Sequence, residues 1–490
     1  MTDLASRTDH RLLPDPRRVI AKLFVPGEET RHGNSRANAV VTRILSLPEP
    51  EARALADAVI AGFGDRHPDV AAILARHFAV VAHEVPAQET LSAQRRTVIG
   101  AYFTHEYAPE AAALFNPSMT AHPDQTGLAA GQTRFAMTVR CVGEGHLSSI
   151  GFRTGVLGPG SSLVVDEPEL VLATGSSTPG PYGRNAFLSR LADLGVEPQN
   201  AQLLLGDLPE NFSADELNTA LTAVHEHTLG RERVQHAIAE VMQIAYATYT
   251  VEFPTTPGLT GRLLWPNAPA ERNGMEDARL VRFTDDDGTI TYYAPFTAYD
   301  GARVATHLLS TQDFRHFDVA PLAGRAARNK GLSLFPRRIA GRYAALSRWD
   351  RENLSLAYSD DGQVWEESTI LHRPQHAWEL IQVGNGGPPI ETSEGWLVLT
   401  HGVGPMRQYA LGAMLLDLHE PSNVVATLSR PLLTPRADER DGYVPNVVYT
   451  CGAMLHDGVL TVPYGISDGA IGFAQTELAT LLSRMTPVAT

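Results

Sequence analysis

The stretch from Asn273 to Arg279 carries residue types that could do chemistry. Glu276 and Asp277 are adjacent carboxylates, and Arg279 follows two residues after Asp277. A carboxyl group held in a cleft beside an arginine can donate a proton or bind a sugar hydroxyl. Because adjacent residues of an extended segment point to opposite faces, we expect one carboxylate to face a pocket and the other to pair with Arg279. The alternative is a surface turn with a local ion pair.

Short strands separated by Gly turns must position this stretch, because they fill the chain from about residue 250 to 480. Four similar strands begin about 50 to 65 residues apart, a spacing typical of a β-propeller with several strands per blade. A fifth such strand precedes them, so we predict five blades. The polar residues that end these strands are expected to gather at one mouth of a central channel; they are Arg140, Thr297, Arg348, His401 and Tyr464. A β-sandwich is the alternative.

Apolar residues at helical spacing predict two regions outside these strands. Residues 1–115 are predicted to be an N-terminal helical region, in which Val98 and Ile99 point inward. Residues from about 183 to 246 are predicted to be a helical insertion, with a capping box from Ser213 to Glu216. The predicted fold is therefore mainly β: a five-bladed β-propeller over residues 116–482, with an N-terminal helical region and a helical insertion.

The composition narrows the class of protein. The chain has 490 residues and a formal net charge of −15, which argues against nucleic acid or an anionic membrane as the main partner. No apolar run is long enough to cross a bilayer, and no signal peptide is visible, so we expect a cytoplasmic protein.

Cysteines and histidines do not predict a metal site. Cys141 and Cys451 lack metal-site spacing and are expected to be buried free thiols in a reducing compartment. His225 and His227, in the predicted insertion with His236, would point to different sides of a helix. We therefore predict no metal.

Several motifs, taken in order, are similar to those of a known family. Asn273 to Arg279 resembles the Glu-Asp-Pro-Arg signature of glycoside hydrolase family 130, with Ala278 in place of the proline. Further motifs resemble that family in its own order; they lie at residues 115–117, 330–336, 341–348, 378–390, 395–403 and 464–468. The resemblance covers residues from about 115 to 480, apart from the predicted insertion.

This resemblance implies a five-bladed propeller that acts on β-mannosides with inversion. Phosphorylases of the family use inorganic phosphate and give α-mannose 1-phosphate, whereas hydrolases use water. Asp277 matches the general acid, which is thought to deliver its proton through a mannose hydroxyl. The implied substrate-binding residues are Asn116, Arg140, Arg279 and Asp468, and the implied phosphate-binding residues are Lys330, Arg348, His401 and Tyr409. Glu276 is expected to be a structural partner of Arg279. No cofactor is implied beyond phosphate as co-substrate.

One departure from the family pattern bears on the choice between phosphate and water. Gln382 stands where many phosphorylases have lysine, which removes a positive charge, and Glu391 adds a carboxylate nearby in sequence. Glu391 is therefore the candidate base if the protein is a hydrolase. Because four of five implied phosphate positions are compatible, we favour a phosphorylase over a hydrolase and over a non-catalytic sugar-binding propeller. The expected partners are a small oligosaccharide and phosphate.

The sequence leaves other points open. The linkage cleaved and the acceptor sugar depend on loops that a sequence does not position. The helical segments could cover the channel mouth or mediate formation of a homo-oligomer.

Overall fold

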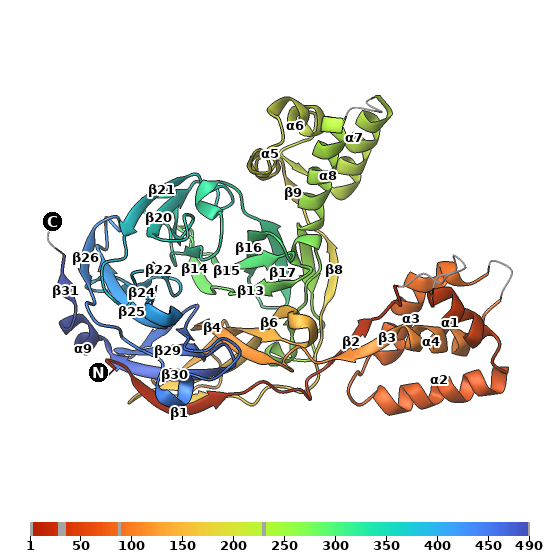
Figure 1. The fold of residues 1–490 in the computed structure, drawn as a ribbon, viewed down its shortest axis with the longest axis horizontal. Helices are drawn as coiled ribbons and strands as arrows, with labels where there is room; N and C mark the ends of the chain where they lie inside the picture. The colour runs from red at the N-terminus through yellow and green to blue at the C-terminus, as the bar shows by residue number, and fades with distance from the viewer. Residues whose placement is uncertain (1–2, 28–35, 87–89, 228–231, 489–490) are drawn as a thin grey trace. The chain divides into compact units, whose positions relative to one another are not determined.

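The computed structural model describes residues 3–27, 36–86, 90–227 and 232–488 (Figure 1). The chain forms two compact units, which we describe separately. One comprises Met1–Pro14, Ala112–Pro168 and Thr174–Thr490, and the other comprises Asp15–Ala111 with Glu169–Ala173. In the described part of the chain, helices are all too short or too polar to span a membrane.

The smaller unit is a helical bundle with one two-stranded ribbon. Its elements are α1 (Arg36–Leu45), α2 (Glu49–Phe63), α3 (Val70–Val81), α4 (Ala93–Tyr102) and the antiparallel pair β2 (Ile20–Leu23) and β3 (Thr104–Tyr107). The Ser92 hydroxyl accepts a hydrogen bond from the Arg95 backbone and caps α4. Val98 and Ile99 are fully buried in the core of this bundle, which confirms that they point inward.

In the larger unit, the described strands fall into five antiparallel groups, apart from one short two-stranded ribbon. The first contains β4 (Ala113–Ala121), β5 (Thr133–Val142), β6 (Ser148–Gly158), β7 (Ser162–Val165) and β12 (Leu263–Leu264). The second contains β13 (Gly274–Glu276), β14 (Val281–Thr284), β15 (Ile290–Tyr299), β16 (Val304–Thr311), β17 (His316–Pro321), β11 (Tyr249–Glu252) and β8 (Ser176–Pro179). A single parallel pair, Gly274 with Ser148, joins these two groups into one sheet of 12 strands.

The remaining groups are separate sheets. The third contains β18 (Ser333–Leu334), β19 (Tyr343–Ser347), β20 (Leu354–Ser359) and β21 (Glu367–His372). The fourth contains β22 (Gln382–Asn385), β23 (Ile390–Thr392), β24 (Gly395–Val403), β25 (Tyr409–Leu416), β26 (Val424–Thr427) and β31 (Thr486–Pro487). The fifth contains β27 (Val448–Tyr449), β28 (Met454–His456), β29 (Val459–Ile466), β30 (Ala470–Glu477) and β1 (Ser6–Leu12), with α9 (Leu478–Ser483) after β30.

Each strand of the predicted repeat lies in a different group. They are β5, β15, β19, β24 and β29, and each pairs with the strand that follows it, in the hairpins β5–β6, β15–β16, β19–β20, β24–β25 and β29–β30. The second group contacts the third through β15 and β18, the third contacts the fourth through β20 and β22, and the fourth contacts the fifth through β25 and β27. The fifth group in turn contacts the first through β29 and β4.

Apolar side chains fill the spaces between neighbouring groups. Leu346 of the third group and Val383, Trp396 and Val398 of the fourth belong to one buried cluster. Leu399 of the fourth group shares a second cluster with residues of β29. Near-continuous apolar runs in strands such as β24 follow from this burial on both faces, because each sheet lies between two others.

Four helices occupy the stretch predicted as an insertion. They are α5 (Arg184–Asp193), α6 (Pro198–Leu205), α7 (Ala214–His227) and α8 (Glu232–Tyr246), with the short pair β9 (Tyr182–Gly183) and β10 (Asn211–Phe212). The capping box is confirmed, because Ser213 donates to Glu216 from its backbone at 2.8 Å and accepts from the Glu216 backbone at 3.3 Å. The side chains of His225 and His227 lie outside the described residues, and His236 is exposed.

The first residues of the chain differ from the prediction. We expected residues 1–115 to be helical, but β1 pairs with β30 and joins the fifth group (Figure 1). The sequence of β1 carries no alternation of apolar residues, because it is a polar edge strand held through its backbone. The side chain of Arg7 anchors β1 to Glu439. Arg7 Nε donates to the Glu439 carboxylate at 2.8 Å, and Arg7 Nη2 donates to it at 2.6 Å.

This anchor yields a stability prediction. The Glu439 side chain is 1% exposed, and Arg7→Ala would leave its carboxylate buried with only the Tyr464 hydroxyl and backbone donors. We expect the free energy of unfolding, measured by urea denaturation, to fall by about 3–5 kcal/mol. Arg11→Ala is the matched control, because its partner Asp438 and Arg11 itself are exposed, and a loss below about 1 kcal/mol is expected. Equal losses for the two variants would contradict the anchoring role.

Candidate active site

Three residues predicted for the site have backbone conformations that are uncommon for residues other than glycine. Asn116, Asp277 and Asp468 have φ angles of 49°, 56° and 52°, all in the left-handed region. Asn116 lies at an irregularity of β4, Asp277 directly follows β13, and Asp468 lies in the turn between β29 and β30. The Asn116 amide donates to the Asp277 carboxylate. Because such conformations concentrate at functional sites, these positions mark a candidate site.

Glu276 and Asp277 face the same cations, which corrects the prediction that they point to opposite faces. Arg140 donates to Glu276 Oε1 at 2.7 Å and to Asp277 Oδ1 at 3.4 Å. The alternation of an extended strand stops at Glu276, because the left-handed φ of Asp277 turns the backbone there. Both carboxylates are buried, so Arg140 compensates two negative charges at once.

Arg279 has partners other than the one predicted. Its Nη1 donates to the backbone carbonyl of Asp277 at 2.9 Å, and its Nη2 donates to the Tyr449 hydroxyl at 2.8 Å. The prediction that Glu276 is its structural partner is therefore wrong. Arg279 is 1% exposed and holds the turn at Asp277 against the fifth group, so its charge also acts on the Asp277 carboxylate.

Lys330 joins the same cluster from the third group. Its ammonium group contacts Glu276 Oε2, and its side chain is about one third exposed. Glu276 is thus neutralised by Arg140 and Lys330 together. An ammonium group has three donors, so Lys330 can bind an anion while it keeps this contact.

Arg348 and His401 meet at the ends of their strands, as the repeat predicts. Arg348 Nη1 donates to His401 Nε2 at 2.9 Å, and His401 Nδ1 lies 3.1 Å from the backbone oxygen of Asn385. Nδ1 must therefore carry the proton. Burial lowers the pKa of His401 well below its usual value, and the charges of Arg348 and Arg279 lower it further. A neutral His401 with both nitrogens engaged positions Arg348 and adds no charge to the site.

The predicted Tyr409 lies beside these residues. Its ring stacks on that of His401 with centroids 6.1 Å apart and an interplanar angle of 12°. The ring of Tyr449 packs edge-on against His401 at 4.9 Å. Two tyrosines therefore fix the plane of the imidazole.

The charge state of Asp277 follows from its neighbours. Burial raises the pKa of this carboxyl, but the charges of Arg140, Lys330 and Arg279 and the Asn116 amide outweigh burial, so the pKa is lowered. Asp277 is therefore ionised at neutral pH in this structure. It can act as an acid only if a bound anion takes up part of the surrounding positive charge.

The pKa of Asp468 shifts in the opposite direction. Burial raises the pKa of its carboxyl to about 7, and the charges of Asp277 and Glu276 add to that rise, while Arg140 and Arg407 oppose it. Two carboxyl groups around one arginine therefore differ in protonation near neutral pH, because their surroundings differ.

Glu391 does not belong to this cluster. It is exposed on β23 and forms an ion pair with Arg337 at 2.7 Å. It pairs with Trp396 at the start of β24, whereas His401 lies five residues further along that strand. At about 3.3 Å per residue this separation is roughly 16 Å, which places Glu391 away from the site. Gln382 is half-buried at the start of β22, and Glu391 is near it only in sequence.

Two residues at the site were not predicted. Tyr449 accepts from Arg279, and Asn385 contributes the backbone oxygen that orients His401. Asn385 lies on β22 and Tyr449 on β27, and each of these strands pairs with the repeated strand of its group, as β4 and β13 do. β22 has four residues and β27 has two, so neither is long enough for a clear alternation of apolar residues in the sequence.

No metal centre stands out in the structure. Among the residues described, no three or more His, Cys, Asp or Glu side chains gather where they could hold a metal ion. Cys141 and Cys451 are buried and form no disulfide, as expected.

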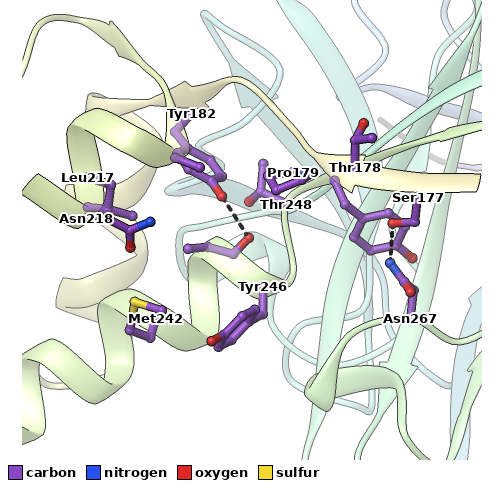
Figure 2. A pocket seen from close by; sticks show the side chains of 13 residues that line it. Ser177, Thr178, Pro179, Tyr182, Leu217, Asn218, Met242, Tyr246, Thr248 and Asn267 are labelled. Atoms are coloured by element: carbon purple, nitrogen blue, oxygen red, sulfur yellow. Dashed lines mark hydrogen bonds between the residues drawn. The ribbon is translucent and has the colours of Figure 1, made fainter. Parts of the chain in front are cut away.

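A separate pocket of about 310 Å³ lies where the insertion meets β8 (Figure 2). Tyr182, Leu217, Met242 and Tyr246 line it together with Ser177 and Asn267, and none of the predicted site residues does. In Figure 2 the Asn267 amide reaches Ser177 and the Tyr182 hydroxyl reaches Ala245. The first contact lies between β8 and the loop after β12, and the second lies within the insertion.

Comparison with known proteins supports an enzyme that acts on glycosidic bonds. Residues 233–486 match a family described as β-1,4-mannooligosaccharide phosphorylase. A 1,2-β-oligomannan phosphorylase from Thermoanaerobacter sp. (strain X514) is 36% identical over 215 residues, which cover 42% of this chain and 70% of that protein. A β-1,2-mannobiose phosphorylase of the same strain is 32% identical over 258 residues, covering 52% and 83%.

The chain belongs to glycoside hydrolase family 130, a family of enzymes, because the matched region spans more than half of it. A solved structure of β-1,2-mannobiose phosphorylase from Listeria innocua in complex with β-1,2-mannobiose aligns with 76% of this chain and 92% of that chain. The identity is 22% and the TM-score 0.45, so the family assignment is based on the sequence matches.

The raised pKa of Asp468 predicts a pH-dependent difference in stability. As pH rises from about 4 to about 7, the unfolded chain loses this proton while the folded chain keeps it, so the stability contributed by the protonated group is lost over that window. Asp468→Asn removes the effect. We expect its Tm to equal that of the parent near pH 4 and to exceed it at pH 8, measured by thermal unfolding. A constant difference in Tm between pH 4 and 8 would contradict the raised pKa.

Proposed function

We propose that the protein is an inverting β-mannoside phosphorylase, which cleaves its substrate with inorganic phosphate to give α-mannose 1-phosphate. The observation that carries this proposal is the pairing of the acidic and basic groups. Arg140 and Lys330 neutralise Glu276, and Glu391 lies away from the cluster, so neither is suited to act as a base for water. Lys330 and Arg348, in contrast, suit a small dianion. The relatives named as phosphorylases support the same choice.

We propose that the five strand groups are the blades of a β-propeller, with the larger unit as the catalytic domain. The closed order of contacts among the five groups supports this architecture. So does the gathering of Asn116, Asp277, Arg348 and His401, which come from four different groups. The helical insertion interrupts the chain between β8 and β11, two paired strands of the second blade, without entering the ring of contacts.

In the proposed reaction, Asp277 is the general acid. It transfers its proton to a hydroxyl of the bound mannose, whose own proton passes to the glycosidic oxygen as the bond from C1 to that oxygen breaks. A phosphate oxygen forms the new bond to C1 from the opposite face, which inverts the configuration. Asn116, Arg140, Arg279 and Asp468 are assigned to hold or orient the sugar. Asn116 and Arg140 contact Asp277 directly, so a sugar bound by them would lie beside the acid.

Phosphate would also prepare the acid for this step. The negative charge of phosphate would offset the positive charge of Lys330. The site would then be less positive, which raises the pKa of Asp277 toward the range in which this carboxyl holds a proton. Binding of the nucleophile and protonation of the acid are then coupled. We propose that His401 takes part by holding Arg348, since its two ring nitrogens contact Arg348 and the backbone of Asn385.

We propose a cytoplasmic location, because a sugar phosphate made inside the cell is retained there, and the two buried cysteines, which form no disulfide, suit a reducing compartment. The reaction as written needs phosphate and no metal. The relatives include proteins named for β-1,2 and for β-1,4 linkages, so both linkages are candidates.

The decisive experiment supplies β-1,2- and β-1,4-linked mannobiose with and without phosphate and measures mannose 1-phosphate and free mannose. We expect mannose 1-phosphate only when phosphate is present, and a loss of at least about 100-fold in kcat for Asp277→Asn, because a general acid contributes roughly 10²–10⁴-fold. Glu391→Gln is the matched control and should keep the parental rate. Free mannose at the same rate without phosphate would instead identify a hydrolase, and binding without turnover a sugar-binding protein.

A further inference from the structure

Several buried polar atoms around the site have no hydrogen-bond partner in the structure. They include Asn116 Oδ1, Arg140 Nε, Arg279 Nε and both polar atoms of the Asn385 side chain. Burying an amide without partners is costly, and native structures satisfy nearly all such groups. Asn385 differs from the others, because its entire amide is unsatisfied while its side chain is about 1% exposed.

The surroundings of Asn385 indicate where its amide acts. Gly331 follows Lys330 and has φ of 104°, and a Cβ added there would lie 3.8 Å from Asn385 Oδ1, 3.7 Å from Arg348 Cβ and 3.9 Å from Arg348 Nε. The amide of Asn385 and the side chain of Arg348 therefore flank one small space, which the missing side chain of Gly331 leaves open. Lys330 directly precedes this glycine in the chain, and its ammonium group contacts Glu276.

The backbone of Asn385 ties this space to Arg348. Its carbonyl oxygen accepts from His401 Nδ1, and His401 Nε2 in turn accepts from Arg348. Asn385 is the last residue of β22 and pairs with Thr400 of β24, so the strand fixes the position of its Cα. The backbone of Asn385 is thus fixed while its amide has no partner, so the residue is preorganised for a ligand.

We propose that Asn385 is a phosphate-binding residue, whose amide Nδ2 donates to a phosphate oxygen held between Lys330 and Arg348. This inference rests on the proposed phosphorylase function. A neutral amide adds a donor for the dianion without adding a positive charge, so it would not lower the pKa of Asp277 further. Because the oxygen and nitrogen of an amide exchange by a half-turn about χ2, either end can be presented to the ligand.

A neutral donor at Asn385 also explains how the space beside Arg348 can bind phosphate although Gln382 and His401 are neutral. Lys330 shares its charge with Glu276, so Arg348 is the cation with the least compensation beside this space. Additional neutral donors are then needed to satisfy the oxygens of the dianion, which accept several hydrogen bonds each. Asn385 supplies such a donor from a neighbouring strand.

The test measures steady-state kinetics of phosphorolysis and the rise of Tm with added inorganic phosphate for the parent and for Asn385→Ala. Losing a hydrogen bond to a charged ligand corresponds to about a 10- to 100-fold rise in KM for phosphate. The KM for the mannoside should change less than twofold. The phosphate-induced rise in Tm should shrink in parallel, because stabilisation follows the dissociation constant. Asn267→Ala, at an exposed asparagine beside the separate pocket, is the control and should match the parent.

A second variant keeps the size of the side chain. Asn385→Asp should weaken the binding of phosphate more than Asn385→Ala does, because a carboxylate would repel the dianion. An unchanged KM for phosphate, or a rise confined to the mannoside, would overturn the assignment. If the parent cleaves the mannoside without phosphate and its Tm does not change when phosphate is added, the proposed function fails instead. That result is separate from any effect of Asn385.

Discussion

Two carboxylates lie side by side in the candidate site, and cations must lie between them. Glu276 and Asp277 are adjacent and buried, and like charges at this separation repel strongly. Arg140 contacts both, Lys330 contacts Glu276, and Arg279 holds the backbone of Asp277. These cations come from different strand groups, so the mutual arrangement of the groups and the electrostatics of the site depend on each other.

The need to compensate these buried charges also determines whether Asp277 and Asp468 hold a proton. The positive charges around Asp277 outweigh its burial and lower its pKa, whereas burial raises the pKa of Asp468 and the charges of Asp277 and Glu276 add to that rise. Two aspartates that share Arg140 as a neighbour are thereby separated in proton affinity. A nucleophile that is itself an anion fits this site, because it changes the balance of charge in the direction that a proton donor requires.

Much of the fold could be predicted from the sequence, because repeated strands and helical periodicity are local patterns. The strands that end near Arg140, Arg348 and His401 could be placed by their spacing, and the arginine and histidine do meet. The opposite-face argument failed at Asp277, because a left-handed φ on a non-glycine residue leaves no signal in a single sequence. Glu391 was misjudged because proximity in sequence says nothing about which end of a strand a residue occupies. The polar strand β1 escaped notice because backbone pairing carries no side-chain pattern.

The pairing of β1 with β30 has a consequence for biosynthesis and engineering. Arg11 of β1 pairs with Gly472 of β30, so this sheet can be completed only after all the residues between them have been synthesised. Such non-local pairing slows folding, because a very long loop must close first. The helical unit between residues 15 and 111 leaves and re-enters the larger unit as an inserted domain, tethered at both ends. A circular permutant that links the segment after β30 directly to β1 would turn this long-range closure into a local hairpin.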